Sequence, residues 1–363
     1  MARHTPPPTP APSPRRQSLG FRLAAALITT LVVLVVLELT VRFLAIDVYF
    51  QNRFFVLNRA PDYPEVFLKD RDLFWRLRPD QAITSRFFEG RTYRINSLGL
   101  RGPEPSANPS TARVLLLGNS CTFGWGVDYR QSLAGTLDSL LGGEYEIVNG
   151  AVPGYSSLQG RRAFERDLAA LDPDVVVAMF GWNDQWAAAG GIPDHEQQLP
   201  SGVLVWLQNQ LGHTHLYRLL KKWWLSAIEP ETDRLFDPTR VIRRVDEAHF
   251  RDNLAAIGEL SREAGARVIL LTEPQPSHPG YGREVTNHPA VRFHRRYNDV
   301  VRRLVSESPL ELVDAAVVFD SSTAFWDDPC QDYIHFNAAG HRRLAELVAA
   351  AIRDASSRSS EAP

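Results

Sequence analysis

The sequence predicts an α/β protein in which five parallel strands form a sheet covered by helices on both faces. From residue 111 onward, short apolar runs alternate with longer segments of helical periodicity. The apolar runs lack the apolar-polar alternation of half-exposed strands, which is typical of strands buried on both faces. The five strand candidates span residues 114–117, 146–148, 175–180, 268–271 and 311–313.

Composition narrows the classes of function. A chain of 363 residues, 44% of them hydrophobic, can bury one large or two ordinary cores. The net charge is −2 and the chain has no basic block, so we expect no nucleic-acid partner. The two cysteines match no zinc-site spacing and a P-loop is missing, so we predict neither a metal nor a cofactor.

The N-terminal region predicts a tail and a membrane anchor. Residues 1–19 are rich in proline and arginine and should be disordered. Residues 20–46 are mostly apolar, and the stretch from 23 to 46 would give roughly 36 Å of helix, enough to cross a bilayer. The preceding arginines favour a cytoplasmic N-terminus in a bacterial inner membrane, with the remaining chain on the outer side. Glu38 and Arg42 are four residues apart and can pair on one helix face.

Three other interpretations of this segment remain open. A cleaved signal peptide needs a small-x-small site, and we find no convincing one after the apolar run. The Arg15-Arg16 pair suggests a twin-arginine signal, but Ser18 stands where an apolar residue is expected. The segment can also be a buried helix of a soluble protein. A single uncleaved anchor fits best.

Two further regions flank or interrupt the predicted α/β domain, which spans 111–355. Residues 47–110 form a stalk or small β element and a linker, with strand candidates at 74–78 and 91–95 and no recognisable chemistry. A helical insertion at about 185–245 contains Trp186, Trp206, Trp223 and Trp224. We expect it to be a cap whose tryptophans pack on the domain. The alternative is an interfacial surface that faces the membrane or a lipid-linked substrate.

The last segments of the chain follow the same pattern. Asn337 is a good N-cap for a final helix with an apolar stripe. Residues 356–363 are predicted to form a disordered tail.

Ser120 is the candidate nucleophile. The stretch RVLLLGNSCTFGWG at 113–126 places this serine after a buried strand and a glycine, at the edge of the sheet where open α/β folds bind ligands. His335 is the candidate base, because Asp332 stands three residues before it and can orient its imidazole.

Two other strand ends supply candidate donors for an oxyanion. Gly154 follows the second strand and can offer an unobstructed backbone N–H. Asn183, in Gly-Trp-Asn-Asp after the third strand, can offer a side-chain N–H.

These four motifs together resemble the SGNH/GDSL hydrolase superfamily over about residues 110–355. The marks are Ser120, Gly154, Asn183, and Asp332 with His335. The resemblance implies a flavodoxin-like three-layer α/β/α fold and an oxyanion hole made by Ser120, Gly154 and Asn183. Asn119 departs from the aspartate usual in the family, and we expect a changed local hydrogen bond there. The α/β-hydrolase pattern G-x-S-x-G is disfavoured, because Thr122 replaces the second glycine.

The resemblance implies a serine esterase that forms an acyl-enzyme on Ser120. The acyl acceptor is water in an esterase, or a sugar hydroxyl in an O-acyltransferase. An anchored member of the family suggests acyl or acetyl groups on an envelope or exopolysaccharide glycan, or a lipid-linked ester, as the substrate. A non-catalytic envelope binding or assembly protein is the alternative from another class.

Two side-chain questions remain open at this stage. Trp125, Trp182 and Trp326 lie beside the motifs and can stack on a sugar, but we favour ordinary packing. Cys121 and Cys330 lie near the predicted site and can form a disulfide. Two unpaired buried thiols are the favoured alternative, because disulfide geometry is demanding.

Overall fold

The structure is a computed structural model of the 363-residue chain, and it describes residues 18–49, 63–84, 90–107, 109–188, 191–228 and 241–360. Most of the predicted N-terminal tail and residues 361–363 lie outside this part. The helices are α1 (Leu19–Leu44), α2 (Ile46–Tyr49), α3 (Ser120–Phe123), α4 (Leu133–Leu141), α5 (Ser157–Ala163), α6 (Gly202–Leu211), α7 (His215–Ile228), α8 (Glu247–Glu263), α9 (Arg283–Thr286), α10 (Pro289–Ser306), α11 (Ala315–Phe319) and α12 (Ala338–Ser360).

The central sheet has five parallel strands in the order β6-β5-β7-β8-β9. Their bounds are β5 (Ala112–Gly118), β6 (Tyr145–Asn149), β7 (Val175–Met179), β8 (Arg267–Leu271) and β9 (Glu311–Val313). Numbered from β5 as the first strand, this is the order 2-1-3-4-5 of flavodoxin-like folds. The predicted five-stranded parallel sheet is confirmed, and only the third predicted strand runs one residue too far.

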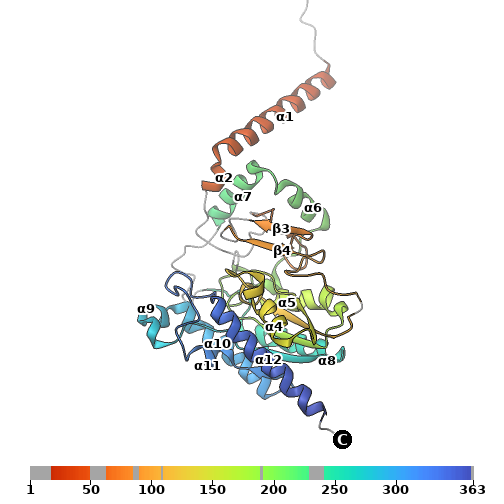
Figure 1. The fold of residues 1–363 in the computed structure, drawn as a ribbon. Helices are drawn as coiled ribbons and strands as arrows, with labels where there is room; N and C mark the ends of the chain where they lie inside the picture. Colours follow the sequence, from red (N-terminus) through yellow and green to blue (C-terminus); the bar gives the residue numbers. More distant parts are fainter. Residues whose placement is uncertain are drawn as a thin grey trace, which may run out of the picture.

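Alternate side chains of each strand face two separate hydrophobic cores. In β5, Leu115 and Leu117 face one core, whereas Val114 and Leu116 face the other, and all four are buried. Helices α5 and α8 cover the first face, and α4 and α12 cover the second (Figure 1). Burying a side chain of this size stabilises the fold by about 1.5–3 kcal/mol. The three-layer α/β/α architecture is therefore confirmed.

Helix α1 extends away from the rest of the molecule (Figure 1). It is the one described helix that is long and apolar enough to cross a membrane, and 6% of its most apolar window is buried. The interpretation as a buried helix of a soluble protein is therefore wrong. The helix begins at the N-cap Ser18, whose side chain accepts a hydrogen bond from the Phe21 N–H.

The C-terminal part of α1 and the short helix α2 each contact α7 through one carboxylate. Glu38 accepts hydrogen bonds from the backbone N–H groups of His215 and Leu216, at 3.0 and 2.8 Å. Asp47 is buried and contacts the imidazole of His215 at 3.0 Å and the guanidinium of Arg218 at 3.3 Å. Glu38 thus caps the N-terminus of α7, a role that sequence proximity to Arg42 did not indicate.

Two antiparallel hairpins precede the sheet. They are β1 (Phe67–Lys69) with β2 (Trp75–Leu77), and β3 (Gln81–Thr84) with β4 (Thr92–Ile95). Both strand candidates of this region are strands, but their partners β1 and β3 were not predicted. Apolar residues of the hairpins, including Trp75 and Tyr93, share a core with Leu115 and Phe123 of the main domain. The region is therefore a small β element packed on the domain, not a free stalk.

The helical insertion differs from its prediction in one respect. It contains α6 and α7, and the Asn209 side chain binds the backbone of Lys69 on β1 through two hydrogen bonds. Trp206, Trp223 and Trp224, however, are 60–63% exposed. The prediction that they pack on the domain is wrong, because α6 uses its polar Asn209 face to contact β1.

The end of the chain also needs a correction. Helix α12 continues to Ser360, so residues 356–360 are helical and not part of a disordered tail. Each residue added to an existing helix gains one backbone hydrogen bond, so a helix can continue beyond its last apolar residue. As predicted, Asn337 is the N-cap, and its side chain accepts from the Ala339 and Gly340 N–H groups.

Candidate active site

Ser120 follows the C-terminal end of β5 and is the first residue of α3. Asn119 caps α3, because its side-chain oxygen accepts the Cys121 N–H at 2.9 Å. A Cβ at Gly118 would lie 2.6 Å from the Thr122 Cβ and 2.8 Å from the Met179 carbonyl oxygen, so only glycine fits at this turn. The strand, the glycine and the cap together fix the position of the serine.

The structure brings Ser120, His335 and Asp332 into one chain of hydrogen bonds. The Ser120 Oγ lies 2.8 Å from the His335 Nε2, and the His335 Nδ1 lies 2.7 Å from the Asp332 Oδ2. The other oxygen, Asp332 Oδ1, accepts the backbone N–H groups of Ile334 and His335 at 2.9 and 3.0 Å. Burial raises the pKa of Asp332, but these hydrogen bonds outweigh it and hold the pKa below its usual value. The carboxylate therefore stays charged and accepts from the imidazole.

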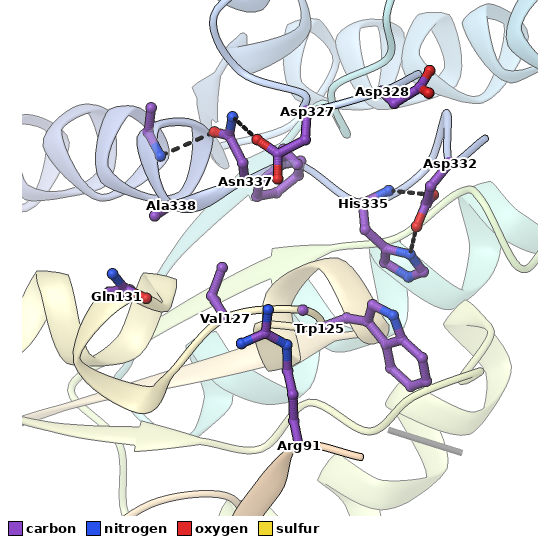
Figure 2. Close-up of a pocket in the computed structure, with 13 residues that line it drawn as sticks. Arg91, Trp125, Val127, Gln131, Asp327, Asp328, Asp332, His335, Asn337 and Ala338 are labelled. Carbon is purple, nitrogen blue, oxygen red and sulfur yellow. Dashed lines mark hydrogen bonds and ion pairs between the residues drawn. The ribbon is translucent and has the colours of Figure 1, made fainter. Parts of the chain in front are cut away.

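Trp125 covers the imidazole. Its ring stacks on His335 with centroids 5.3 Å apart and an angle of 22° between the planes. Figure 2 shows the indole directly beside the imidazole, on the side away from α12. Because the loop that carries Trp125 follows α3, Ser120 and the ring that stacks on His335 lie on one continuous segment.

Arg101 holds this loop in place from the N-terminal β element. Its guanidinium donates to the carbonyl oxygens of Phe123, Gly124 and Val127 at 2.9, 2.6 and 2.7 Å, and lies 4.2 Å from the centroid of the Tyr93 ring. Burial lowers the pKa of Arg101 to about 10. Residues 47–110, for which we predicted no chemistry, therefore have a structural role, because Arg101 holds the loop that carries Trp125.

Gly154 and Asn183 lie at the ends of the two strands that flank β5. Gly154 has a φ of +84°, a conformation that favours glycine. Asn183 is anchored by a hydrogen bond from its Nδ2 to the Tyr155 carbonyl at 3.1 Å, which leaves its second amide N–H available. Among the described residues, neither the Ser120 nor the Gly154 N–H has a hydrogen-bond acceptor. Three N–H donors thus come from the three predicted positions.

Arg244, which sequence reasoning missed, links these two loops. It is buried and donates to the Gly154 carbonyl at 2.9 Å and the Asn183 carbonyl at 3.4 Å. Its charge is balanced by the buried Asp194, at 2.7 Å, which also accepts the Ser156 hydroxyl at 2.8 Å. Both Arg244 and Asp194 belong to the insertion, so this segment supports the loops that carry Gly154 and Asn183.

Glu273 is a second buried group that the sequence did not reveal. It follows β8 and accepts the Asn119 Nδ2 at 2.8 Å and the Trp182 N–H at 2.8 Å. Burial raises the pKa of Glu273 to about 7, although these hydrogen bonds oppose the shift. The expected change of hydrogen bonding at Asn119 is thus explained, because an amide donor faces this carboxyl where an aspartate would repel it.

The structure decides the two open side-chain questions. Cys121 is buried and Cys330 is exposed, and both are free, so the disulfide interpretation is wrong. The favoured alternative predicted two unpaired, buried thiols. Both thiols are unpaired, but only Cys121 is buried. Trp182 and Trp326 are buried in the core, where Trp182 stacks on His294 at 4.0 Å. Packing, not sugar stacking, is therefore confirmed for these two rings.

A cavity of about 440 Å³ opens beside His335. Its lining is mostly polar, and Ser120 is not part of it. The polar and charged residues that line it are Arg91, Gln131, Asp327, Asp328, Asp332, His335 and Asn337. Arg91 reaches toward it from the edge of β4, opposite the aspartates of the loop before α12 (Figure 2). The space next to the base therefore suits a hydrophilic molecule.

Comparison with known protein families identifies the family of the chain. The model of the GDSL-like lipase/acylhydrolase family matches residues 116–343. The chain belongs to this family. The family consists of ester-cleaving hydrolases, and the match includes all five predicted site residues. No curated protein matches this chain.

Several solved structures are similar to the chain at low identity. TesA is 21% identical over 65% of this chain and 95% of its own, with a TM-score of 0.41. A lipase/acylhydrolase from Enterococcus faecalis is 19% identical over 67% and 96%, with a TM-score of 0.43. The acetylxylan esterase Axe2 from Geobacillus stearothermophilus is 18% identical over 65% and 92%, with a TM-score of 0.42.

Proposed function

We propose that this member of the family is a serine esterase with Ser120 as nucleophile, His335 as general base and Asp332 as the residue that orients the base. The observation that carries the proposal is the continuous contact from the Ser120 Oγ through the imidazole to the Asp332 carboxylate, at 2.8 and 2.7 Å. A nucleophile, a base and an orienting group within bonding reach are the requirement for activating a serine hydroxyl.

The reaction would proceed in two steps. His335 Nε2 takes the Ser120 proton while the Oγ attacks the ester carbonyl, and the imidazolium then protonates the leaving alcohol. Water, deprotonated by the same imidazole, next attacks the acyl carbonyl, and the imidazolium returns the proton to the Ser120 Oγ as the bond between Oγ and the acyl carbon breaks and the acid is released. The negative charge on the carbonyl oxygen in each step would be stabilised by the N–H groups of Ser120 and Gly154 and the amide of Asn183.

The substrate we propose is a hydrophilic ester, such as an acyl or acetyl group on an envelope or exopolysaccharide glycan. The support is the polar lining of the cavity beside His335, where the leaving alcohol must be protonated. A sugar hydroxyl that occupied this cavity could also replace water as the acceptor, which would make the protein an O-acyltransferase. Incubation with an activated acyl donor and a sugar acceptor, followed by mass analysis for acylated sugar, separates the two activities.

We also propose that α1 is retained as an anchor in a bacterial inner membrane, with the N-terminus in the cytoplasm and the hydrolase domain outside. The two hydrogen bonds of Glu38 with α7 support retention, because cleavage of a signal peptide at the end of the apolar segment, after residue 46, would remove Glu38. Carbonate extraction and protease protection of bacterial spheroplasts test the anchor and its orientation.

Labelling with a fluorophosphonate tests the catalytic proposal. The probe should add to Ser120 in the wild type, as located by peptide mapping, and should fail to add to His335→Ala. The matched control is Ser321→Ala, which removes an exposed hydroxyl on another loop and should label normally. An unlabelled wild-type protein that is folded would instead favour the non-catalytic binding or assembly protein.

A further inference from the structure

Helices α6 and α7 carry exposed apolar side chains at the same helical spacing. Val203, Trp206 and Leu207 on α6, and Leu220, Trp223 and Trp224 on α7, each follow the pattern i, i+3, i+4, so each set lies on one side of its helix. All six side chains are 42–77% exposed. We call these six residues the apolar face of the insertion.

This face contrasts with the other sides of the same two helices. On α6, Asn209 binds the backbone of Lys69, and on α7, Lys222 donates to the Asp47 carbonyl oxygen at 2.6 Å. The polar sides are thus occupied by contacts within the protein. The tryptophans are left outside, although large exposed apolar patches are rare on proteins that contact water alone.

The position of α7 is fixed at the end of the apolar helix. Glu38 caps α7, and the segment predicted to cross the bilayer ends eight residues later, at residue 46, so α7 begins beside the part of α1 that approaches the membrane surface. Trp224 is nine residues after His215, which places it about 14 Å along α7 from this point, at 1.5 Å per residue. Figure 1 shows α7 and α6 at the end of the domain that α1 leaves.

We infer that the apolar face of the insertion binds the lipid bilayer, with Trp206, Trp223 and Trp224 at the boundary between headgroups and acyl chains. Tryptophan favours this boundary because its ring is apolar and its indole N–H is polar. A helix that lies in the membrane surface has one apolar side and one polar side with basic residues, as α7 has. The inference rests on the proposed retention of α1, and it adds a second contact that would hold the hydrolase domain against the membrane.

Quenching by brominated lipid tests this inference in the full-length protein. Helix α1 contains no tryptophan, and of the five tryptophans outside the face, Trp75, Trp125, Trp182 and Trp326 are buried and Trp186 is half-buried. The protein is reconstituted in vesicles of phosphatidylcholine, either plain or brominated at carbons 6 and 7 of one acyl chain. Because three of eight tryptophans lie on the face, we expect bromination to lower the emission by about a third.

Two variants make the result specific. The triple variant Trp206→Phe, Trp223→Phe and Trp224→Phe should keep its vesicle binding but lose the difference between the two lipids. The control Trp186→Phe should keep that difference. Equal emission of the wild type in both vesicles, or unchanged quenching of the triple variant, overturns the inference.

Two measurements on the same samples separate this inference from the proposals on which it depends. Failure of the chain to sediment with vesicles would overturn the anchor and the lipid contact together. Sedimentation without quenching would overturn the lipid contact alone. Fluorophosphonate labelling of Ser120 reports on the catalytic proposal independently of either result.

Discussion

The two halves of the candidate site are held in different ways. The half with the base is local, because Asp332 and His335 are three residues apart in one loop and the Asp332 side chain is 45% exposed. The half with the proposed oxyanion donors is assembled from distant segments, because buried Arg244 connects the carbonyls of Gly154 and Asn183. The first half resembles a surface loop, and the second resembles a protein core.

Because of this difference, substitutions in the two halves should affect different properties, namely the rate of the reaction in one half and the stability of the fold in the other. A change in the exposed half alters the proton transfer but leaves little buried charge without a partner. Loss of Arg244 from the buried half would leave the Asp194 carboxylate without its ion pair, and an unpaired buried charge is costly. Variants of the two halves should therefore divide into those that lose turnover and those that lose stability.

The largest effect is expected for Ser120→Ala. Removal of the nucleophile should lower kcat for hydrolysis of p-nitrophenyl acetate by about 10⁴- to 10⁶-fold, because triad members act as a unit. The midpoint of urea unfolding should stay unchanged, since the hydroxyl contributes only the contact with His335. Hydrolysis close to the wild-type rate would contradict the assignment of Ser120.

Asp332→Asn tests whether the orienting residue sets the tautomer of His335. The backbone N–H groups of Ile334 and His335 both bind Oδ1, so an asparagine would keep its oxygen there and direct its NH₂ toward the His335 Nδ1. That arrangement places the ring proton on Nε2, where it cannot accept the serine proton. We expect kcat to fall by about 10²- to 10⁴-fold. Asp138→Asn, on the exposed side of α4, is the matched control and should retain the wild-type kcat.

Arg244→Met should act mainly on stability. It leaves the buried Asp194 carboxylate without its ion pair, so the free energy of unfolding should fall by about 3–5 kcal/mol. The control is Arg251→Met, which breaks the exposed ion pair with Glu307 and should cost at most about 1 kcal/mol. Chemical denaturation measures both, and equal losses for the two variants would show that Arg244 is no structural link.

Glu273→Gln should change how stability depends on pH. The folded pKa of Glu273, about 7, lies above its ordinary value of 4.5, so its stabilising contribution is complete below pH 4.5 and is lost as the pH rises through 7. The glutamine cannot lose a proton, so the variant should lack this decline, a difference of about 3 kcal/mol between pH 4.5 and 8. Urea unfolding across this pH range measures it. The exposed Glu263→Gln is the control and should keep the wild-type decline.

Sequence reasoning found the groups with local signatures. Apolar runs predict the five strands because a strand buried on both faces needs apolar side chains at every position. The Asp-x-x-His spacing predicts the contact between Asp332 and His335, because two side chains three residues apart can meet within a single turn of the chain. Ser120 and Gly154 carry similar local signals, namely a strand followed by a turn residue. The structure brings Ser120, His335 and Asp332 into contact and places Gly154 in the loop after β6.

The supporting residues lacked such signals. Arg101, Arg244 and Glu273 are single charged residues, and charged residues usually lie on the surface. Their partners are 22 to 154 residues away, so their roles become visible only when those segments meet. The exposure of Trp206, Trp223 and Trp224 was missed for a related reason, because periodicity defines the apolar side of a helix but not what that side faces.

The sequence by itself determined the sheet, the apolar N-terminal helix and the identity of the groups that can do chemistry, because each depends on the order of neighbouring residues. Tertiary structure alone decided which buried charges support those groups, which cysteines stay apart and which tryptophans remain uncovered. These outcomes depend on distances between segments far apart in the chain, and burial changes the energy of a charge only after those segments have packed.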